Sequence, residues 1–306
     1  MAGDALQHKI RNWLSPPDPW KNHNIACRSR HSGTAAWFVQ SDTFSQWKSS
    51  TSSTLLWVHG KRQLPPYRYT FADSDCFPFY SGRGKERALV CLPFDIPILR
   101  LTVLGSSTII EEIEVMRKSG LASLAMFYYD FREDRKRDLQ GLLSSVLFQL
   151  CDQSDSYHDI LSTFYSTHRR GAQTPGDDQL VQCLKDLLEL PGQAPVFLII
   201  DALDECPNTS ALSSPRDSVL MFVEDLIEAQ LPNLRICVTS RPEPDIRVIL
   251  EPLTFHSISI HDERGQIEDI EKYIKSAVNT NRKMRKWKPA HKQLVIETLT
   301  KRADGM

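Results

Sequence analysis

The sequence lacks the features that mark several broad classes of protein. Its 37 Lys and Arg residues balance 38 Asp and Glu residues, so the formal net charge of -1 gives no general attraction to nucleic acid or to an anionic membrane. The longest apolar stretch, residues 88–104, is interrupted by Pro93, Asp95, Pro97 and Arg100, which argues against a membrane-spanning helix. No internal repeat of about 20–50 residues is present, so a solenoid is excluded.

Disulfide and metal-binding motifs are missing as well. The 7 cysteines are scattered without a C-x-x-C pair, and the 9 histidines show no H-E-x-x-H spacing. Cysteines of this kind are typical of a reducing compartment. The first residues carry Asp4, His8 and Lys9 where a secretory signal would need an apolar run. We therefore expect a cytoplasmic protein without a disulfide framework or a zinc site.

Apolar runs of strand length alternate with amphipathic segments through the middle of the chain. Five segments contain such runs: LLWVHGK, LASLAMFYYDF, PVFLIIDALDEC, LRICVTSRPEPD and FHSISI. Between several of them, apolar residues recur at helical spacing over residues 109–116, 139–150, 180–188 and 219–227. Strands that are apolar on both faces and alternate with helices predict an α/β fold, in which a parallel sheet is covered on both sides.

The two ends of the chain are expected to be mainly helical. Residues 1–49 form a lead-in with a short helix from Leu6 to Leu14 and a longer one over TAAWFVQSDTFSQWK, joined by a polar connection around Asn22 and Asn24. Residues 50–260 hold the α/β core. Residues 261–306 hold the first helices of a further domain, because Ile267, Ile270, Ile274 and Val278 recur at helical spacing.

Three acids follow the apolar run of PVFLIIDALDEC. Asp201 ends the predicted strand, and Asp204 and Glu205 come directly after it. A carboxylate at the carboxyl edge of a parallel sheet can hold a hydrated Mg²⁺ beside nucleotide phosphates, and a further acid can orient or deprotonate an attacking water. The alternative is that turn-forming acids simply end the strand. Three acids in so short a span favour the metal site.

Polar side chains also end the next predicted strand. Thr239, Ser240 and Arg241 lie at its exit. The guanidinium group is a planar fork that matches phosphate oxygens, so Arg241 can sense a terminal phosphate. A solvated surface arginine is the alternative interpretation.

The chain resembles the NACHT domain, a P-loop NTPase of the STAND class, of fungal NOD-like receptors in segments that keep their order: SSTLLWVHGK, STIIEEIE, FYYDFREDRKRDLQGLLSSVLFQLC, VFLIIDALDEC and RICVTSRPEPDI. That class includes heterokaryon-incompatibility proteins and nephrocystin-like N-terminal domains. The resemblance covers about Lys9 to Met306, apart from residues 62–102. It implies a signal-transduction ATPase in which nucleotide exchange converts a closed monomer into an open oligomer, with sensor domains that lie beyond this sequence.

The resemblance also implies roles for individual residues. Asp201 matches the acid that coordinates Mg²⁺, Asp204 and Glu205 match the hydrolytic acids, and Arg241 matches the sensor arginine. The implied ligands are ATP or GTP with Mg²⁺. The implied partners are nucleotide and, through self-association or contact with other chains, signalling proteins, whereas nucleic acid and membrane are not expected.

A second set of residues matches nucleotide-binding positions outside the acidic run. Gly60 and Lys61 lie where the phosphate loop of such proteins begins. Gly33, Thr34 and Trp37 lie where these proteins approach the nucleotide base.

The phosphate loop itself departs from the family pattern. The Walker A motif G-x-x-x-x-G-K-S/T should continue from Gly60, but its last three residues would fall on Pro65, Pro66 and Tyr67. We interpret SGRGKE, at residues 81–86, as a chance match because no strand precedes it. Losing roughly three charge-assisted hydrogen bonds of about 1.5–3 kcal/mol each would weaken a micromolar site to about millimolar. We expect an impaired switch or, alternatively, a non-catalytic pseudo-NTPase or fragment that acts as a protein-interaction module.

An atypical insert explains the missing motif. Residues 61–105 hold five of the 18 prolines, with aromatic residues at no regular period, so no packed element is predicted there. The segment VLGSSTIIEEI then resumes the family pattern. We hypothesise that residues 62–102 are a translated intron or an error in the gene model.

Sequencing of the transcript tests this hypothesis. We expect cDNA in which the insert is absent, because the family pattern continues on either side of it. A cDNA that encodes all of QLPPYRYTFADSDCFPFY would contradict the hypothesis.

Overall fold

The computed structural model describes residues 2–29, 35–60, 77–79, 88–90, 101–209, 214–254, 256–259, 264–280, 284 and 287–303. The chain divides into two units, one formed by residues 1–61 and 102–269 and the other by residues 62–101 and 270–306. Each unit is described by itself. In the described part of the chain, every helix is too short or too polar to cross a membrane.

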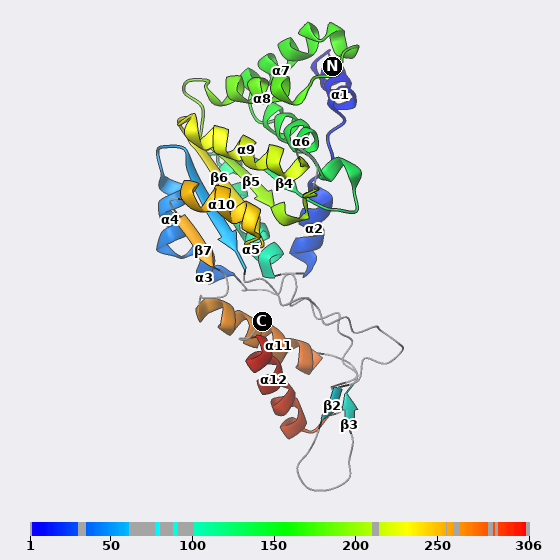
Figure 1. Cartoon of the computed structure of the whole chain (residues 1–306), viewed down its shortest axis with the longest axis vertical. Helices are drawn as coiled ribbons and strands as arrows, with labels where there is room; N and C mark the ends of the chain where they lie inside the picture. The colour runs from blue at the N-terminus through cyan, green and yellow to red at the C-terminus, as the bar shows by residue number, and fades with distance from the viewer. Residues whose placement is uncertain are drawn as a thin grey trace. The chain divides into compact units, whose positions relative to one another are not determined.

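A five-stranded sheet forms the centre of the first unit (Figure 1). Its strands, in the order β4-β5-β6-β1-β7, are β4 (Ser123–Tyr128), β5 (Val196–Asp201), β6 (Leu234–Ser240), β1 (Thr54–His59) and β7 (His256–Ser259). All neighbouring strands pair in parallel. Every residue of β4, β5 and β6 is buried, as expected of strands covered on both faces. The predicted α/β fold with a parallel sheet is confirmed.

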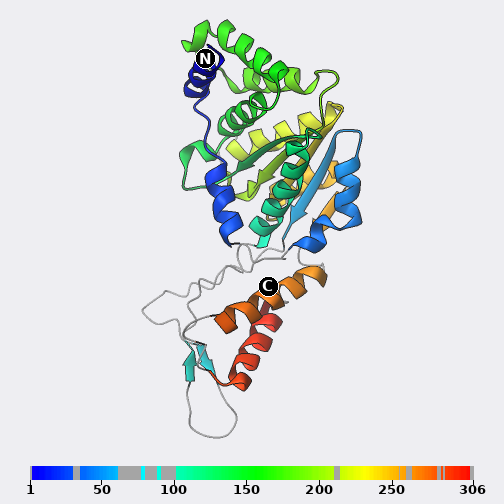
Figure 2. The same cartoon turned by 180° about the vertical axis from the view of Figure 1, so that it is seen from behind.

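Helices cover both faces of this sheet (Figures 1 and 2). One face is covered by α1 (Ala2–Leu14), α6 (Leu139–Cys151), α7 (Asp155–Thr167), α8 (Asp177–Leu188), α9 (Pro215–Glu228) and α10 (Pro244–Leu253). The other face is covered by α3 (Ala36–Val39), α4 (Asp42–Ser49) and α5 (Leu101–Lys118). Successive strand residues contribute to opposite cores: Trp57 packs with the first set of helices, and Leu56 and Val58 pack with the second.

Side-chain caps fix where two helices next to the sheet edge begin. Ser214 Oγ accepts a hydrogen bond from the Asp217 N–H, and the Asp217 carboxylate accepts one from the Ser214 N–H, both at 3.1 Å, at the start of α9. Asp138 Oδ1 accepts a hydrogen bond from the Gly141 N–H at 2.8 Å and starts α6. These caps give both helices defined starting points.

The lead-in differs from its prediction in two places. The single helix expected over residues 34–48 is two helices, because Ser41 caps a new one by accepting a hydrogen bond from the Phe44 N–H at 3.2 Å. The polar connection around Asn22 is in fact helix α2 (Trp20–Ser29). This helix is held by polar contacts, including Lys21 to Glu133 at 2.5 Å, rather than by an apolar stripe.

The second unit holds an antiparallel pair of strands, β2 (Phe77–Phe79) and β3 (Ala88–Val90), together with α12 (Pro289–Ala303) and most of α11 (Arg264–Thr280). The sequence analysis assigned no element to residues 61–105, whereas the structure has these two strands and the first turn of α5 there. The remainder of residues 61–100, including the SGRGKE string, lies outside the described residues.

Gly141 is expected to be intolerant of any side chain, even though alanine favours helices. A Cβ atom at this position would lie 1.9 Å from the Arg135 carbonyl oxygen. We expect Gly141→Ala to lower the free energy of unfolding by about 3 kcal/mol, or roughly 6–12 °C in Tm.

Gly176→Ala is the matched control, because a Cβ there would meet no atom within 4 Å. Thermal denaturation of both variants measures the difference. Equal Tm values would show that Arg135 moves aside without cost.

Candidate functional site

The helices that follow β1 and β6 in this unit lie on opposite faces of the sheet. The next element of this unit after β1 is α5, on the face of α4, whereas α10 follows β6 on the other face. In open α/β sheets, ligands bind where such connections diverge, outside the carboxyl ends of the strands. Gly60 follows β1 at this edge, Asp201 ends β5 and Ser240 ends β6.

Asp201 is a buried carboxyl group, 2% exposed, that pairs with no lysine or arginine in the described part of the chain. The Thr239 hydroxyl donates to its Oδ1 at 2.5 Å, and the Ser106 hydroxyl forms a second hydrogen bond. Burial raises the pKa of Asp201 to about 7; the two hydroxyls lower it, and the nearby Asp204 and Glu205 raise it. Because an unpaired buried charge is costly, this carboxyl either holds a proton near neutral pH or attracts a cation.

Tyr128 extends the polar layer around Asp201. It lies beside Asp201 in the register between β4 and β5. Its hydroxyl hydrogen-bonds to Ser106 and lies 3.0 Å from His23 Nδ1 in α2. Burial raises the pKa of Tyr128 well above its usual value, so the hydroxyl stays protonated. The layer therefore joins α2, β4 and α5 to the end of β5.

Ser106 and the adjacent Ser107 are fully buried residues that the sequence analysis did not assign. They lie in the second turn of α5, inside the segment VLGSSTIIEEI, and not in a loop between a strand and a helix as Walker A residues would. Their position in α5, a helix that packs on the same face as Leu56, is the signal that could have identified them.

The chain turns sharply after Asp201. Ala202 adopts the left-handed conformation, with φ 56° and ψ 45°, at a cost of about 1–2 kcal/mol for a residue with a side chain. Its N–H donates to Thr239 Oγ1 at 3.1 Å, so Thr239 holds both the turn and the Asp201 carboxyl. The 3-10 turn Leu203–Glu205 follows directly. Strained turns of this kind concentrate at functional sites.

Arg241 binds both carboxylate oxygens of Asp204. Its backbone N–H donates to Oδ1 at 3.0 Å, and its Nε donates to Oδ2 at 2.6 Å. The Asp204 side chain is 10% exposed, whereas that of Arg241 is 54% exposed. The structure thus brings together the two residues predicted as hydrolytic acid and sensor, and it pairs them with each other.

Glu205 is less constrained than Asp204. Its Oε2 accepts a hydrogen bond from the Phe131 N–H at 3.4 Å. Burial raises the pKa of Glu205; the Phe131 N–H lowers it, and neighbouring acids raise it. A carboxyl group whose pKa lies closer to neutrality is better suited to accept a proton from water.

The donor set at this edge fits Mg²⁺ better than a metal held by the protein alone. Among the described residues, no group of three or more His, Cys, Asp or Glu is placed to hold a metal ion. Mg²⁺ usually takes one or two carboxylates and completes its octahedron with water and phosphate oxygens. Asp201, flanked by hydroxyl groups, meets that requirement. The phosphate side fits less well, because the residues that should complete the Walker A motif after Gly60 are Pro65, Pro66 and Tyr67.

Several other predicted binding residues are not located by the structure. Lys61, Gly33 and Thr34 lie outside the described residues. Trp37 lies in α3, and its indole Nε1 donates to Asp269 Oδ2 of α11 at 3.0 Å. The described partner of Trp37 is therefore Asp269, in the part of α11 that belongs to the first unit, and a role beside the nucleotide base stays a prediction.

Comparison with known proteins gives one family match. The family described as nephrocystin 3, N-terminal, matches residues 102–241, just under half of the chain. No curated protein matches the sequence. Among solved structures, the ORC2 protein of Aeropyrum pernix, in ADPNP–ADP complexes, matches with 13% identity and a TM-score of 0.36. The match covers 86% of this chain and 64% of that one, so less than two thirds of the ORC2 chain is spanned.

Replacement of Asp201 by Asn should stabilise the protein, and more so as the pH rises. The pKa of about 7 exceeds the ordinary 3.8, so the folded protein retains a proton that the unfolded chain loses. Stability is therefore greatest below about pH 4 and falls as the pH rises to about 7. The advantage of Asp201→Asn should grow by about 2–3 kcal/mol between pH 5 and pH 7.

Urea denaturation at both pH values measures this difference. Asp134→Asn is the control, because that side chain is 93% exposed and its neutralisation should have little effect. An advantage of Asp201→Asn that is the same at both pH values would contradict the raised pKa.

Proposed function

We propose that the first unit is a nucleotide-binding switch domain of NACHT type that binds a nucleoside triphosphate with Mg²⁺ weakly and turns it over very slowly. One observation carries the proposal. Asp201, its two hydroxyl partners and Arg241 lie at the sheet edge from which the helices after β1 and β6 take opposite faces. The family match supports it, because the matched span begins in α5 and ends at Arg241.

Asp201 would be the protein ligand of Mg²⁺. Binding of the ion requires the ionised carboxylate, and the Thr239 and Ser106 hydroxyls can donate to that form. The ion would supply charge neutralisation for the phosphates. Since the ionised carboxylate has no paired cation in the described residues, metal binding would also relieve an unfavourable buried charge.

Arg241 and Glu205 would act on the far side of the phosphates. The exposed guanidinium of Arg241 can turn from Asp204 to a terminal phosphate, for which it offers paired N–H donors. Glu205 is the better candidate to accept a proton from water, because burial raises its pKa. Asp204 would then hold Arg241 in place until phosphate arrives.

Weak affinity follows from the missing Walker A lysine, because the residues that should complete the motif after Gly60 are Pro65, Pro66 and Tyr67. The Ser106 hydroxyl does not replace that lysine, since it carries no charge and is bound to Asp201 and Tyr128. Loss of the lysine alone removes about 1.5–3 kcal/mol, or roughly tenfold to a hundredfold in affinity. We therefore expect dissociation constants of about 0.1 mM or weaker, compared with a micromolar reference site.

A non-catalytic interaction module is the second candidate. The observation that favours it is the pairing of Asp204 with Arg241, which satisfies both groups without a ligand. In this case, the sheet would serve as a scaffold for self-association or for contact with another signalling protein. The two candidates differ in whether Mg²⁺ and a triphosphate bind.

Calorimetric titration of the full chain with ATP and Mg²⁺ separates the candidates. We expect saturable binding that disappears when Mg²⁺ is omitted and weakens at least about tenfold in Asp201→Asn. The same substitution should raise stability, so loss of binding would not reflect unfolding. Glu205→Gln should retain binding and abolish any residual hydrolysis.

Asp134→Asn serves again as the control and should bind like the wild type. Binding that persists in Asp201→Asn would contradict the assigned metal ligand. Absence of saturable binding up to about 10 mM ATP, ten times the roughly millimolar constant expected when the whole Walker A motif is missing, would leave the interaction module as the function.

A further inference from the structure

Arg216 is a buried cation in an unfavourable position. It lies in the first turn of α9, and its side chain is 5% exposed. Positive charge at a helix N-terminus is opposed by the helix dipole, and burial adds a desolvation cost. A residue that breaks both rules is often retained for function.

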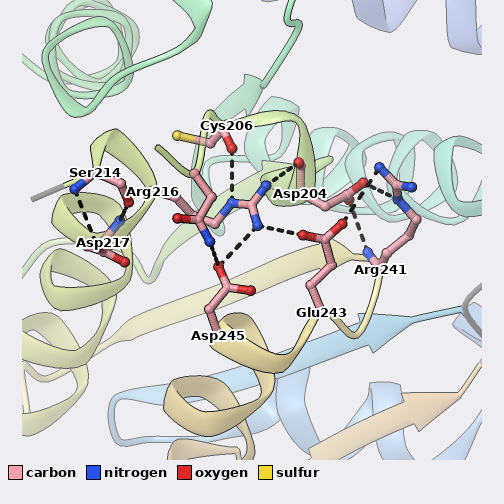
Figure 3. A network of polar contacts seen from close by, with 9 residues as sticks. Asp204, Cys206, Ser214, Arg216, Asp217, Arg241, Glu243 and Asp245 are labelled. Carbon is pink, nitrogen blue, oxygen red and sulfur yellow. Dashed lines mark hydrogen bonds and ion pairs between the residues drawn. The ribbon is translucent and has the colours of Figure 1, made fainter. Parts of the chain in front are cut away.

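Four hydrogen bonds hold the Arg216 guanidinium (Figure 3). Nη2 donates to the carbonyl of Asp204 at 2.6 Å, and Nε donates to the carbonyl of Cys206 at 2.9 Å. Nη1 bridges the carboxylates of Glu243 at 2.6 Å and Asp245 at 3.0 Å. Arg216 thus ties the turn after β5 to the start of α10, directly after β6.

The two arginines of this network differ in freedom. Glu243 lies between them, at 2.6 Å from Arg216 Nη1 and 3.9 Å from Arg241 Nη2. The Arg241 side chain is 54% exposed, ten times as much as that of Arg216. Arg216 binds the main chain of Asp204, whereas Arg241 binds its carboxylate. One arginine is therefore fixed, and the other is able to exchange its partner.

We propose that Arg216 is a positioning residue that lets Arg241 exchange the Asp204 carboxylate for the terminal phosphate of a nucleotide. This inference rests on the proposed function. When Arg241 turns away, Arg216 still neutralises Glu243 and still holds the turn that carries Asp204. Without Arg216, Glu243 becomes a competing partner for Arg241, and the turn loses its link to α10.

The affinity ratio of ATP to ADP reports the engagement of the terminal phosphate. We expect Arg241→Met to lower this ratio about tenfold, the value of one charge-assisted contact. Arg216→Lys, which keeps the charge but loses the fork, should lower the ratio by a similar factor. In the double variant the two effects should not add, because both act on the same contact.

A purely structural role of Arg216 would produce a different pattern. Arg216→Lys would then lose stability. Either the ATP-to-ADP affinity ratio would stay unchanged, or the effects of the two substitutions would multiply in the double variant, and either result would overturn the proposal. Arg247→Met is the matched control, since Arg247 lies in α10, shortly after Arg241 in the chain, and is 55% exposed, close to the 54% of Arg241. Glu243→Gln removes the carboxylate charge that lies between Arg216 and Arg241, and it provides a second test if Arg216→Lys does not fold.

Amide hydrogen exchange without nucleotide separates this inference from the proposed function. The Arg241 N–H, which donates to Asp204, should exchange about tenfold faster in Arg216→Lys and Glu243→Gln than in Arg247→Met. If the wild type binds no ATP, the proposed function fails, but faster exchange would still support positioning of the Asp204–Arg241 pair. Unchanged exchange in both variants would refute the positioning role, whatever the nucleotide titration shows.

Discussion

The carboxyl group of Asp201 is removed from water at the end of β5, where hydroxyl groups rather than cations meet it in the described part of the chain. Its two possible states have opposite consequences. In the protonated state the group is a neutral part of the polar layer, and in the ionised state it is a charge that needs a cation. The surrounding structure holds the group in place: the Thr239 hydroxyl hydrogen-bonds both to the Asp201 carboxyl and to the strained turn at Ala202. A fold selected for stability alone would place an apolar or amide side chain here.

The acids beyond this turn form a second, separate electrostatic system. Asp204 and Arg241 bind each other, and Arg216 fixes the main chain beneath them. Asp201 takes no part in this pairing and is available to a ligand, and Glu205 is the least constrained of the three acids. Such a division suits a site that keeps the metal and sensor functions of a nucleotide-binding domain. The missing Walker A lysine explains why the affinity and turnover that we propose are low.

Much of the sheet could be predicted, because buried parallel strands are encoded as short apolar runs. The same runs located Asp201 and Arg241, since a residue that directly follows a strand has little freedom of position. Helix α2 could not be predicted, because its buried side includes His23, which is satisfied by the Tyr128 hydroxyl. The division of residues 34–48 into two helices depends on the cap at Ser41, which an unbroken aromatic pattern concealed.

Residues that act through the fold rather than through a motif were the hardest to find. Ser106 belongs to no motif, and Arg216 has no sequence signal apart from its place after a cap. The pairing of Asp204 with Arg241 depends on the adjacency of β5 and β6, which the chain order alone does not specify. The contacts of Ser106, Arg216 and the Asp204–Arg241 pair can be identified only when the strand order is known.

Titration of the Asp201 carboxyl by ¹³C NMR tests the central claim most directly. We expect the pKa of Asp201 in the free protein to be about 7, because burial raises it. Saturating Mg²⁺ and ATP should lower that pKa by at least about one unit, because a bound cation favours the carboxylate. A carboxyl that titrates near 3.8 in the free protein, or that does not respond to the metal and nucleotide, would contradict the account.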